Sequence, residues 1–210
     1  MSPPRPIIVV DTREQTPWRF SRDVDVVRAT IPSGDYAIVA PDVPEYLTRR
    51  KRPKKKDAPP PAFPVLSASG SSEHVAVFEG PDGVVRYPLL PWRVERKASD
   101  FAASCTSDRP RFERELVRLG ANFRPARVVL VVEYTFNEIE AGIYRSQASP
   151  QSLIASTVAI HHDYGITTHW GGSREECARW VERWLVMALE RHVEATREEL
   201  AERDAIAQET

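Results

Sequence analysis

Little in the composition commits this chain to a special class of protein. Its 210 residues include two cysteines, Cys105 and Cys177, which lie far apart and in no metal-ligand spacing. This excludes a disulfide scaffold and predicts two buried thiols. No stretch approaches the roughly 18 apolar residues that a membrane helix requires, and the first residues lack the apolar segment of a signal peptide. We therefore expect an intracellular protein with no membrane contact, in the cytoplasm or nucleoid, or in the nucleus of a eukaryote.

The distribution of charge is more informative than its total. The net charge is -1 at pH 7, which neither requires nor excludes a nucleic-acid partner. Residues 49–56 hold seven basic side chains in eight positions, whereas residues 194–210 are rich in Glu. Any contact with a polyanion is therefore expected to be local.

Strand and helix patterns alternate along the chain and predict an α/β domain with helices over a central mixed sheet. β-branched and aliphatic runs predict strands at 7–10, 36–39, 92–97, 127–133 and 166–170. Helices are expected to begin after Asp108, Ser149 and Ser173, the last through a capping box with Glu176. The segment 24–30 is ambiguous and is expected to be helical in part.

The stretch from about residue 40 to residue 91 differs in composition and predicts an insertion. It combines the basic run with consecutive prolines and a Ser-rich segment, so it is expected to be disordered in part. Near its end, two β-branched runs flank Pro81-Asp82-Gly83 and predict a hairpin. We expect residues 1–193 to form one domain that this insertion interrupts, and residues 194–210 to form a charged helical tail.

Acidic and basic side chains gather at the ends of two predicted strands. Glu95 and Lys97 are two apart on one strand and therefore point to the same face, whereas Arg96 points elsewhere. Together with Asp35, just before another strand, they form an acid followed by acid-x-Lys. Two carboxylates offer Mg²⁺ hard oxygen ligands, and a nearby lysine can orient water and balance charge on phosphorus. The pattern suits phosphodiester hydrolysis; the alternative is a solvated ion pair at a strand end.

Three motifs in this order resemble the nuclease domain of the XPF-type structure-specific endonucleases, a branch of the PD-(D/E)XK nucleases. They are Val10-Asp11-Thr12-Arg13-Glu14, Gly34-Asp35-Tyr36, and Val94-Glu95-Arg96-Lys97 followed by Asp100. The segment Arg111-Phe-Glu-Arg-Glu115 resembles the family's Arg-x-x-x-Gln helix. The resemblance spans nearly the whole chain outside the insertion, and it implies a restriction-endonuclease-like core.

By this resemblance, Asp35 and Glu95 are the principal ligands of Mg²⁺, for which Mn²⁺ is a possible substitute. Lys97 is the catalytic lysine, and Asp11 or Glu14 lies nearby as a further ligand or as support for one.

Four further roles follow from the same resemblance. Arg96 is counted with Glu14 among the catalytic residues, and it is expected to hold Asp100 or to contact DNA. Asp100 either caps the helix that follows it or supports the active site, and Arg13 is a second supporting residue. Arg111 is expected to contact phosphate.

Two features depart from the family pattern. Glu115 stands where the resemblance leads us to expect Gln, which is expected to weaken a backbone or DNA contact without abolishing metal binding. The Glu-rich residues after Trp184 lack the glycine-bearing hairpins of the tandem helix-hairpin-helix module that commonly follows this domain. Recognition of junctions or flaps is therefore in question, and a helix-hairpin-helix partner is one possible source of it.

The basic run is open to three interpretations. It is expected to be a flexible arm that neutralises DNA phosphates without reading sequence; the alternatives are a solvated or partner-binding loop, or a nuclear localisation signal. The residues concerned are Arg49, Arg50, Lys51, Arg52, Lys54, Lys55 and Lys56.

The leading hypothesis is a structure-selective DNA endonuclease that acts by Mg²⁺-assisted hydrolysis in repair, recombination or DNA processing. One alternative is a non-catalytic DNA-binding or scaffold subunit, since the family includes partners whose nuclease site has decayed. Another is a restriction or defence nuclease with the same core. The presence of Asp35, Glu95 and Lys97 favours activity. Because members of this family pair their nuclease domains, a homodimer or heterodimer through the last two helices is also expected.

Overall fold

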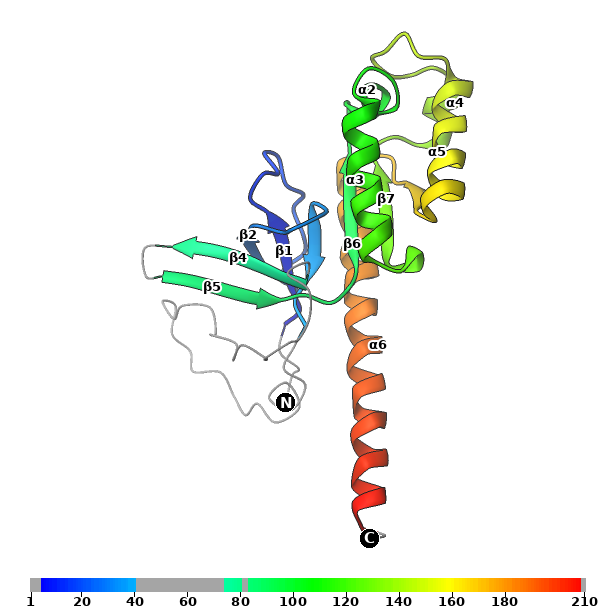
Figure 1. Ribbon diagram of the computed structural model, residues 1–210. Helices are drawn as coiled ribbons and strands as arrows, with labels where there is room; N and C mark the ends of the chain where they lie inside the picture. Colours follow the sequence, from blue (N-terminus) through cyan, green and yellow to red (C-terminus); the bar gives the residue numbers. More distant parts are fainter. Residues whose placement is uncertain (1–4, 41–73, 81–82, 209–210) are drawn as a thin grey trace.

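A central mixed sheet with helices packed on it forms the body of the molecule in the computed structural model (Figure 1), which describes residues 5–40, 74–80 and 83–208. The sheet has six strands in the order β2-β1-β3-β6-β7-β8. β1 pairs in parallel with β2, as β7 does with β6 and β8, whereas β3 is antiparallel to both β1 and β6. The strands are β1 Ile7–Asp11, β2 Asp25–Ala29, β3 Tyr36–Ile38, β6 Arg93–Lys97, β7 Val128–Val132 and β8 Thr167–Trp170.

Five α-helices and one 3₁₀ turn connect or follow the strands of the second half of the chain. The predicted capping box of the last helix is confirmed: the Ser173 backbone N–H donates to the Glu176 carboxylate at 3.0 Å, and the Glu176 N–H donates to Ser173 Oγ at 3.3 Å. Figure 1 shows this helix running along the sheet and on past it. The elements are α2 Phe101–Cys105, α3 Arg109–Asn122, η2 Pro125–Arg127, α4 Phe136–Glu140, α5 Pro150–Tyr164 and α6 Arg174–Gln208.

One face of the sheet is covered by α6. Alternate residues of the strands, such as Ile8, Val94 and Val131, share a buried cluster with Val181 and Leu185 of α6. Because side chains alternate across a strand, the intervening residues point to the opposite face. The helix therefore packs on several strands and closes one side of the core.

The opposite face is covered in two separate parts. Over β7, the helices α2, α3 and α5 bury a cluster that includes Leu116, Leu130 and Leu153. Over β1 and β3, a hairpin buries another cluster around Val9 and Ala37. Strand β6 lies between β3 and β7, so its residues on this face lie where the two covers meet.

The hairpin consists of β4 Val75–Gly80 and β5 Gly83–Pro88, as predicted, although the turn at 81–82 lies outside the described residues. It is tied to the rest of the domain by isolated bridges from Thr30 to Val77 and from Val39 to Leu89. Ala76 and Tyr87 are buried against the sheet. The hairpin is thus part of the core cover. The predicted disorder of the insertion falls on residues 41–73, which lie outside the description.

The partly helical prediction for residues 24–30 is wrong. Residues Asp25–Ala29 form β2, which pairs in parallel with β1 at one edge of the sheet. The backbone bonds that stabilise β2 come from a strand 18 residues earlier in the pairing Ile7 to Asp25, and local periodicity does not report such pairing.

Residues 194–208 continue α6 without a break. No helix among the described residues is long and apolar enough to cross a membrane.

Candidate active site

Three charged side chains of β6 point to the face where the two covers meet. Arg93, Glu95 and Lys97 are 0%, 6% and 4% exposed. A solvated ion pair at a strand end would be open to water, so this burial rules out that alternative for Glu95 and Lys97. Burial of ionic groups is costly unless they are paired and hydrogen-bonded, and their partners therefore define the site.

Arg93 has a structural environment. Its Nη1 donates to the carbonyl oxygens of Leu90 at 2.6 Å and Trp92 at 2.8 Å, and its guanidinium lies 4.6 Å from the ring centroid of Phe123. The other two charged residues of this face, farther along β6, lie in an open pocket.

Lys97 and Glu95 lie on the same face, as their spacing predicts, and form a buried ion pair. Lys97 Nζ lies 2.8 Å from Glu95 Oε1 and 3.5 Å from Glu115 Oε2 on α3. The ammonium also lies 4.7 Å from the ring centroid of Phe112. Although burial lowers the pKa of Lys97, the neighbouring Glu95 outweighs it, and the net shift is upward. Lys97 is therefore a charged ammonium in this pocket.

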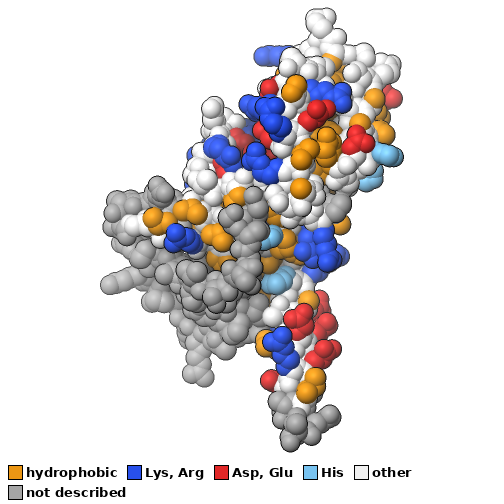
Figure 2. Space-filling model, viewed as in Figure 1, with side chains coloured by type: hydrophobic (Ala, Val, Ile, Leu, Met, Phe, Trp, Pro, Cys, Tyr) orange, Lys and Arg blue, Asp and Glu red, His pale blue; other side chains and the backbone are white. Residues whose placement is uncertain are grey.

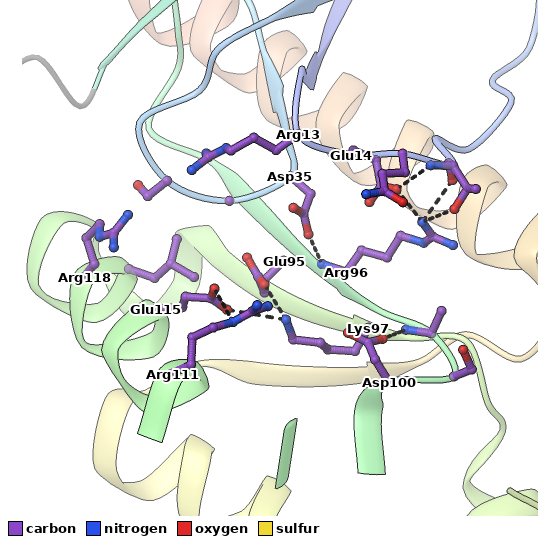
Figure 3. A pocket seen from close by; sticks show the side chains of 17 residues that line it. Arg13, Glu14, Asp35, Glu95, Arg96, Lys97, Asp100, Arg111, Glu115 and Arg118 are labelled. Carbon is purple, nitrogen blue, oxygen red and sulfur yellow. Dashed lines mark hydrogen bonds and ion pairs between the residues drawn. The ribbon is translucent and has the colours of Figure 1, made fainter. Parts of the chain in front are cut away.

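Asp35 reaches the same place from the turn before β3. Gly34 adopts φ +81, and a Cβ there would lie 3.1 Å from the carbonyl oxygen of Val94, so glycine allows the turn to approach β6 closely. The Asp35 N–H donates to that carbonyl at 2.8 Å. In return, the Arg96 N–H donates to Asp35 Oδ2 at 2.7 Å. These bonds aim the Asp35 carboxylate into the pocket, toward Glu95 (Figure 3).

The two carboxylates of Asp35 and Glu95 share a poorly solvated space. Burial raises the pKa of Asp35 well above its ordinary value, and the nearby Glu95 raises it further. Burial also raises the pKa of Glu95, against the opposing effect of Lys97. Like charges held together out of water are destabilising unless a cation joins them. A cation held by both carboxylates would relieve this repulsion.

The pocket has a volume of about 680 Å³ and an arginine-rich lining. The side chains of Arg13 and Arg111 are 62% and 60% exposed, and Arg118 lines the same pocket from α3. Figure 2 shows Lys and Arg side chains gathered over and beside α3, with acidic side chains among them. This combination of carboxylates within and guanidinium groups around the opening suits an anionic polymer whose phosphate enters the pocket.

Arg96 points to the other face of β6, as the alternation predicts. Its Nε donates to Glu133 at 2.8 Å, and its Nη1 donates to Glu14 at 2.9 Å. Trp18 completes this group, which we name the Arg96 cluster: its indole N–H donates to Glu133, and its ring lies 5.5 Å from the guanidinium. Of the two expectations for Arg96, a contact with Asp100 is wrong, because its side-chain hydrogen bonds go to Glu133, Glu14 and Thr16.

Glu14, expected as a catalytic residue or a ligand, lines the pocket but belongs to the Arg96 cluster. Its Oε1 accepts hydrogen bonds from Arg96 and from the Thr16 N–H at 2.9 Å each. These bonds favour a supporting role.

Asp11 lies outside the pocket lining, although the resemblance made it a possible ligand. It is 1% exposed. Its Oδ1 accepts bonds from the backbone N–H and Nε of Arg13, and its Oδ2 accepts from Arg13 Nη2 and the Ile31 N–H. With both oxygens engaged, Asp11 orients Arg13 at the pocket rim, which argues against direct metal ligation.

Asp100 and Arg111 lie at the pocket as expected. Asp100 precedes α2 but makes no side-chain capping bond; its Oδ1 instead accepts from the Ala98 N–H at 2.9 Å and braces the turn after β6. Arg111 Nε lies 3.3 Å from Asp108 and 3.6 Å from Glu115. Of the two alternatives for Asp100, the structure favours support of the site.

No role was predicted for Arg118 or Glu133, which lie at or beside the site, and Glu115 was predicted only to weaken a backbone or DNA contact. Arg111, Glu115 and Arg118 are spaced i, i+4 and i+7 along α3, so they lie on one face of the helix. This spacing could have identified Glu115 and Arg118 as neighbours of Arg111. Glu133 directly follows β7, which is parallel to β6, so both strands deliver polar groups to the same edge. The basic run at 49–56 lies outside the described residues.

The residues present fit a magnesium ion. Among the described side chains, no group of three or more His, Cys, Asp or Glu converges as a ready metal site. Mg²⁺ does not demand one, because it keeps several waters and is commonly held by one or two carboxylates plus substrate phosphate. Asp35 and Glu95 offer two such carboxylates, and a bound cation would also relieve their mutual repulsion.

Comparison with known proteins finds a matching family and a similar fold. The family model of the ERCC4 domain matches residues 10–183. The solved structure of XPF from Aeropyrum pernix in complex with DNA has a TM-score of 0.52 at 22% sequence identity, covering 89% of this chain and 66% of that one. A second structure of XPF from Aeropyrum pernix has a TM-score of 0.49 at 21% identity, covering 87% of this chain and 61% of that one.

The chain spans 66% and 61% of the length of these two proteins, slightly less than two thirds of each. The first likeness establishes the same mixed sheet flanked by helices. A comparison with curated proteins gave no match. The family model covers most of the sequence, and the chain belongs to the ERCC4 domain family.

Proposed function

We propose that this protein is a metal-dependent DNA endonuclease that hydrolyses phosphodiester bonds and selects its substrate by DNA structure. The observation that carries the proposal is the buried Glu95–Lys97 pair at 2.8 Å, placed beside Asp35 in an open pocket. Membership of the ERCC4 domain family supports the reaction class. The similar structure from Aeropyrum pernix is described as a complex with DNA, which supports DNA as the substrate.

Each residue has a role that its geometry supports. Asp35 and Glu95 would hold Mg²⁺ or Mn²⁺, and the ion would supply Lewis-acid activation of the phosphoryl group and a more acidic bound water. Lys97, charged and fixed by Glu95, can donate to a phosphate oxygen where charge develops in the transition state. Arg13, oriented by Asp11, and Arg111 can bind the flanking phosphates.

The proposal is tested by cleavage of labelled flap, fork, duplex and single-stranded DNA with Mg²⁺, Mn²⁺ or EDTA. We expect cutting only with a divalent cation, and a loss of about 100-fold or more in Asp35→Asn and Lys97→Ala, as for removal of a group that stabilises transition-state charge. Glu113→Gln is the matched control, because Glu113 pairs with Arg109 on the same helix and does not line the pocket. Binding without cutting of any substrate would instead indicate a DNA-binding subunit.

We also propose that two nuclease domains pair through α5 and α6, either as a homodimer or with a related chain. A half-buried aromatic row supports this: His169 of the edge strand β8 stacks on Trp180 at 3.8 Å between ring centroids, and Trp180 stacks on Trp184 at 6.1 Å. Half-exposed aromatic side chains are common at interfaces. Sedimentation should show a species of twice the monomer mass at micromolar concentration; a monomer throughout would overturn the homodimer.

A further inference from the structure

Glu115 introduces a third carboxylate into the pocket, between the two cationic groups that a phosphate would need. Its Oε2 lies 3.5 Å from Lys97 Nζ, and its Oε1 lies 3.6 Å from Arg111 Nε. In Figure 3 its side chain points from α3 toward Glu95 and Lys97. One side chain thus touches both the lysine of the proposed chemistry and the arginine proposed to bind phosphate.

The charge around Glu115 is unfavourable for a phosphate. Asp35 and Glu95 face it across the pocket, and the negative charge of Glu115 adds to theirs. The facing cations are Lys97, Arg13, Arg111 and Arg118. Of these, Lys97 and Arg111 are in contact with Glu115 itself. A phosphate that enters therefore meets the repulsion of three carboxylates, while two of the cations are already engaged.

We infer that Glu115 is a positioning residue that makes DNA binding in this pocket depend on a divalent cation. It acts through Lys97 and Arg111. Because both side chains contact the Glu115 carboxylate, they are less available to bind phosphate. A cation that joins Asp35 and Glu95 removes most of the repulsion, and the two cationic side chains can then turn to the DNA. This inference rests on the proposed function, because it assumes that DNA binds at this pocket.

The position of Glu115 distinguishes it from other acids on the same helix. Glu113 is two residues away, carries the same charge and pairs with Arg109 at 2.7 Å, but it lies outside the pocket lining. Neutralising either residue changes the net charge of the protein equally. Only neutralisation of Glu115 removes charge from the path of the phosphate and releases Lys97 and Arg111.

The test is the affinity of the full chain for fluorescent fork DNA, measured by anisotropy in EDTA and again in Ca²⁺. Glu115→Gln keeps the shape of the side chain and is expected to bind about fivefold more tightly than wild type in EDTA, as for the removal of one nearby, partly screened charge. In Ca²⁺ the two proteins should differ by less than twofold. Glu113→Gln should match wild type in both solutions, and Glu115→Ala should change affinity in the same direction as Glu115→Gln.

The sign of the effect separates this inference from simple damage to the fold, since damage would weaken binding in EDTA. Equal or weaker binding by Glu115→Gln would overturn the inference while leaving the proposed function intact. An equal gain in Glu113→Gln would also overturn it, because net charge would then be the cause. If wild type bound no DNA in EDTA and none in Ca²⁺, both the inference and the proposed function would be overturned.

Discussion

The charged groups on the two faces of β6 differ in the partners that they find. In the Arg96 cluster, two carboxylates receive the guanidinium of Arg96, the indole N–H of Trp18 and a backbone N–H. In the pocket, Glu95 and Glu115 share the ammonium of Lys97, Glu115 has a looser contact with the exposed Arg111, and Asp35 accepts a backbone N–H.

The difference lies in how fully the charges are paired. A buried polar network whose members all find partners stabilises and fixes the structure, whereas a network with surplus like charge stores free energy that a ligand can release. The Arg96 cluster joins the loop after β1 to the ends of β6 and β7. In the pocket, by contrast, the carboxylates can bind a cation and the cationic side chains can bind a phosphate. Adjacent residues of one strand thus serve stability and function on opposite faces.

The largest effect should come from breaking the Arg96 cluster. Arg96→Met leaves Glu14 and Glu133 without the guanidinium that both carboxylates contact. We expect the free energy of unfolding to fall by about 3 kcal/mol, because removal of one partner leaves buried charge uncompensated. Urea unfolding measures it.

The control for this change is Arg109→Met, which breaks an exposed ion pair with Glu113 and should alter stability little. Arg96→Lys should restore only part of the loss, because Nε and Nη1 of Arg96 contact different carboxylates, and one ammonium cannot reproduce that fork. If Arg96→Met unfolded at the same urea concentration as wild type, the contrast between the two faces would be lost.

The predictable part of this structure follows from local patterns. The β-branched runs specified β1, β3 and β7, and the two-residue spacing placed Glu95 and Lys97 on one face with Arg96 on the other. Sequence motifs also brought Asp35 to the same site. The strands and the faces of their side chains follow from a two-residue alternation along the chain, so they can be predicted without knowing what packs against the strand.

The unpredicted part depends on contacts between distant segments. The pairing of β2 with β1, and the convergence of Glu14 and Glu133 on Arg96, are fixed by how the strands are ordered in the sheet. Glu115 was treated as a departure from a family pattern, because its contact with Lys97 depends on how α3 docks over β6. Periodicity reports the face of a helix but not what that face meets.

A smaller effect, of opposite sign, should follow from neutralising a carboxylate in the pocket. Asp35→Asn removes one of two like charges held close together, and Asn Oδ1 can still accept the bond from the Arg96 N–H. We expect the free energy of unfolding in EDTA to rise by roughly 1 kcal/mol, as functional sites often trade stability for activity. Glu133→Gln, the matched change in the Arg96 cluster, should lower it. With Mg²⁺ present, wild type should gain stability and Asp35→Asn should gain less.

The pH dependence of the Asp35→Asn gain identifies its cause. Burial, followed by the charge of Glu95, raises the pKa of Asp35 in the folded protein above its value of about 4 in the unfolded chain. The folded state therefore binds more protons, and the contribution of Asp35 to stability falls as pH rises from the unfolded pKa through the folded one. The advantage of Asp35→Asn over wild type in EDTA should accordingly be small near pH 4.5 and larger at pH 8. An advantage that stayed constant across this range would show that the buried charge of Asp35 is not its source.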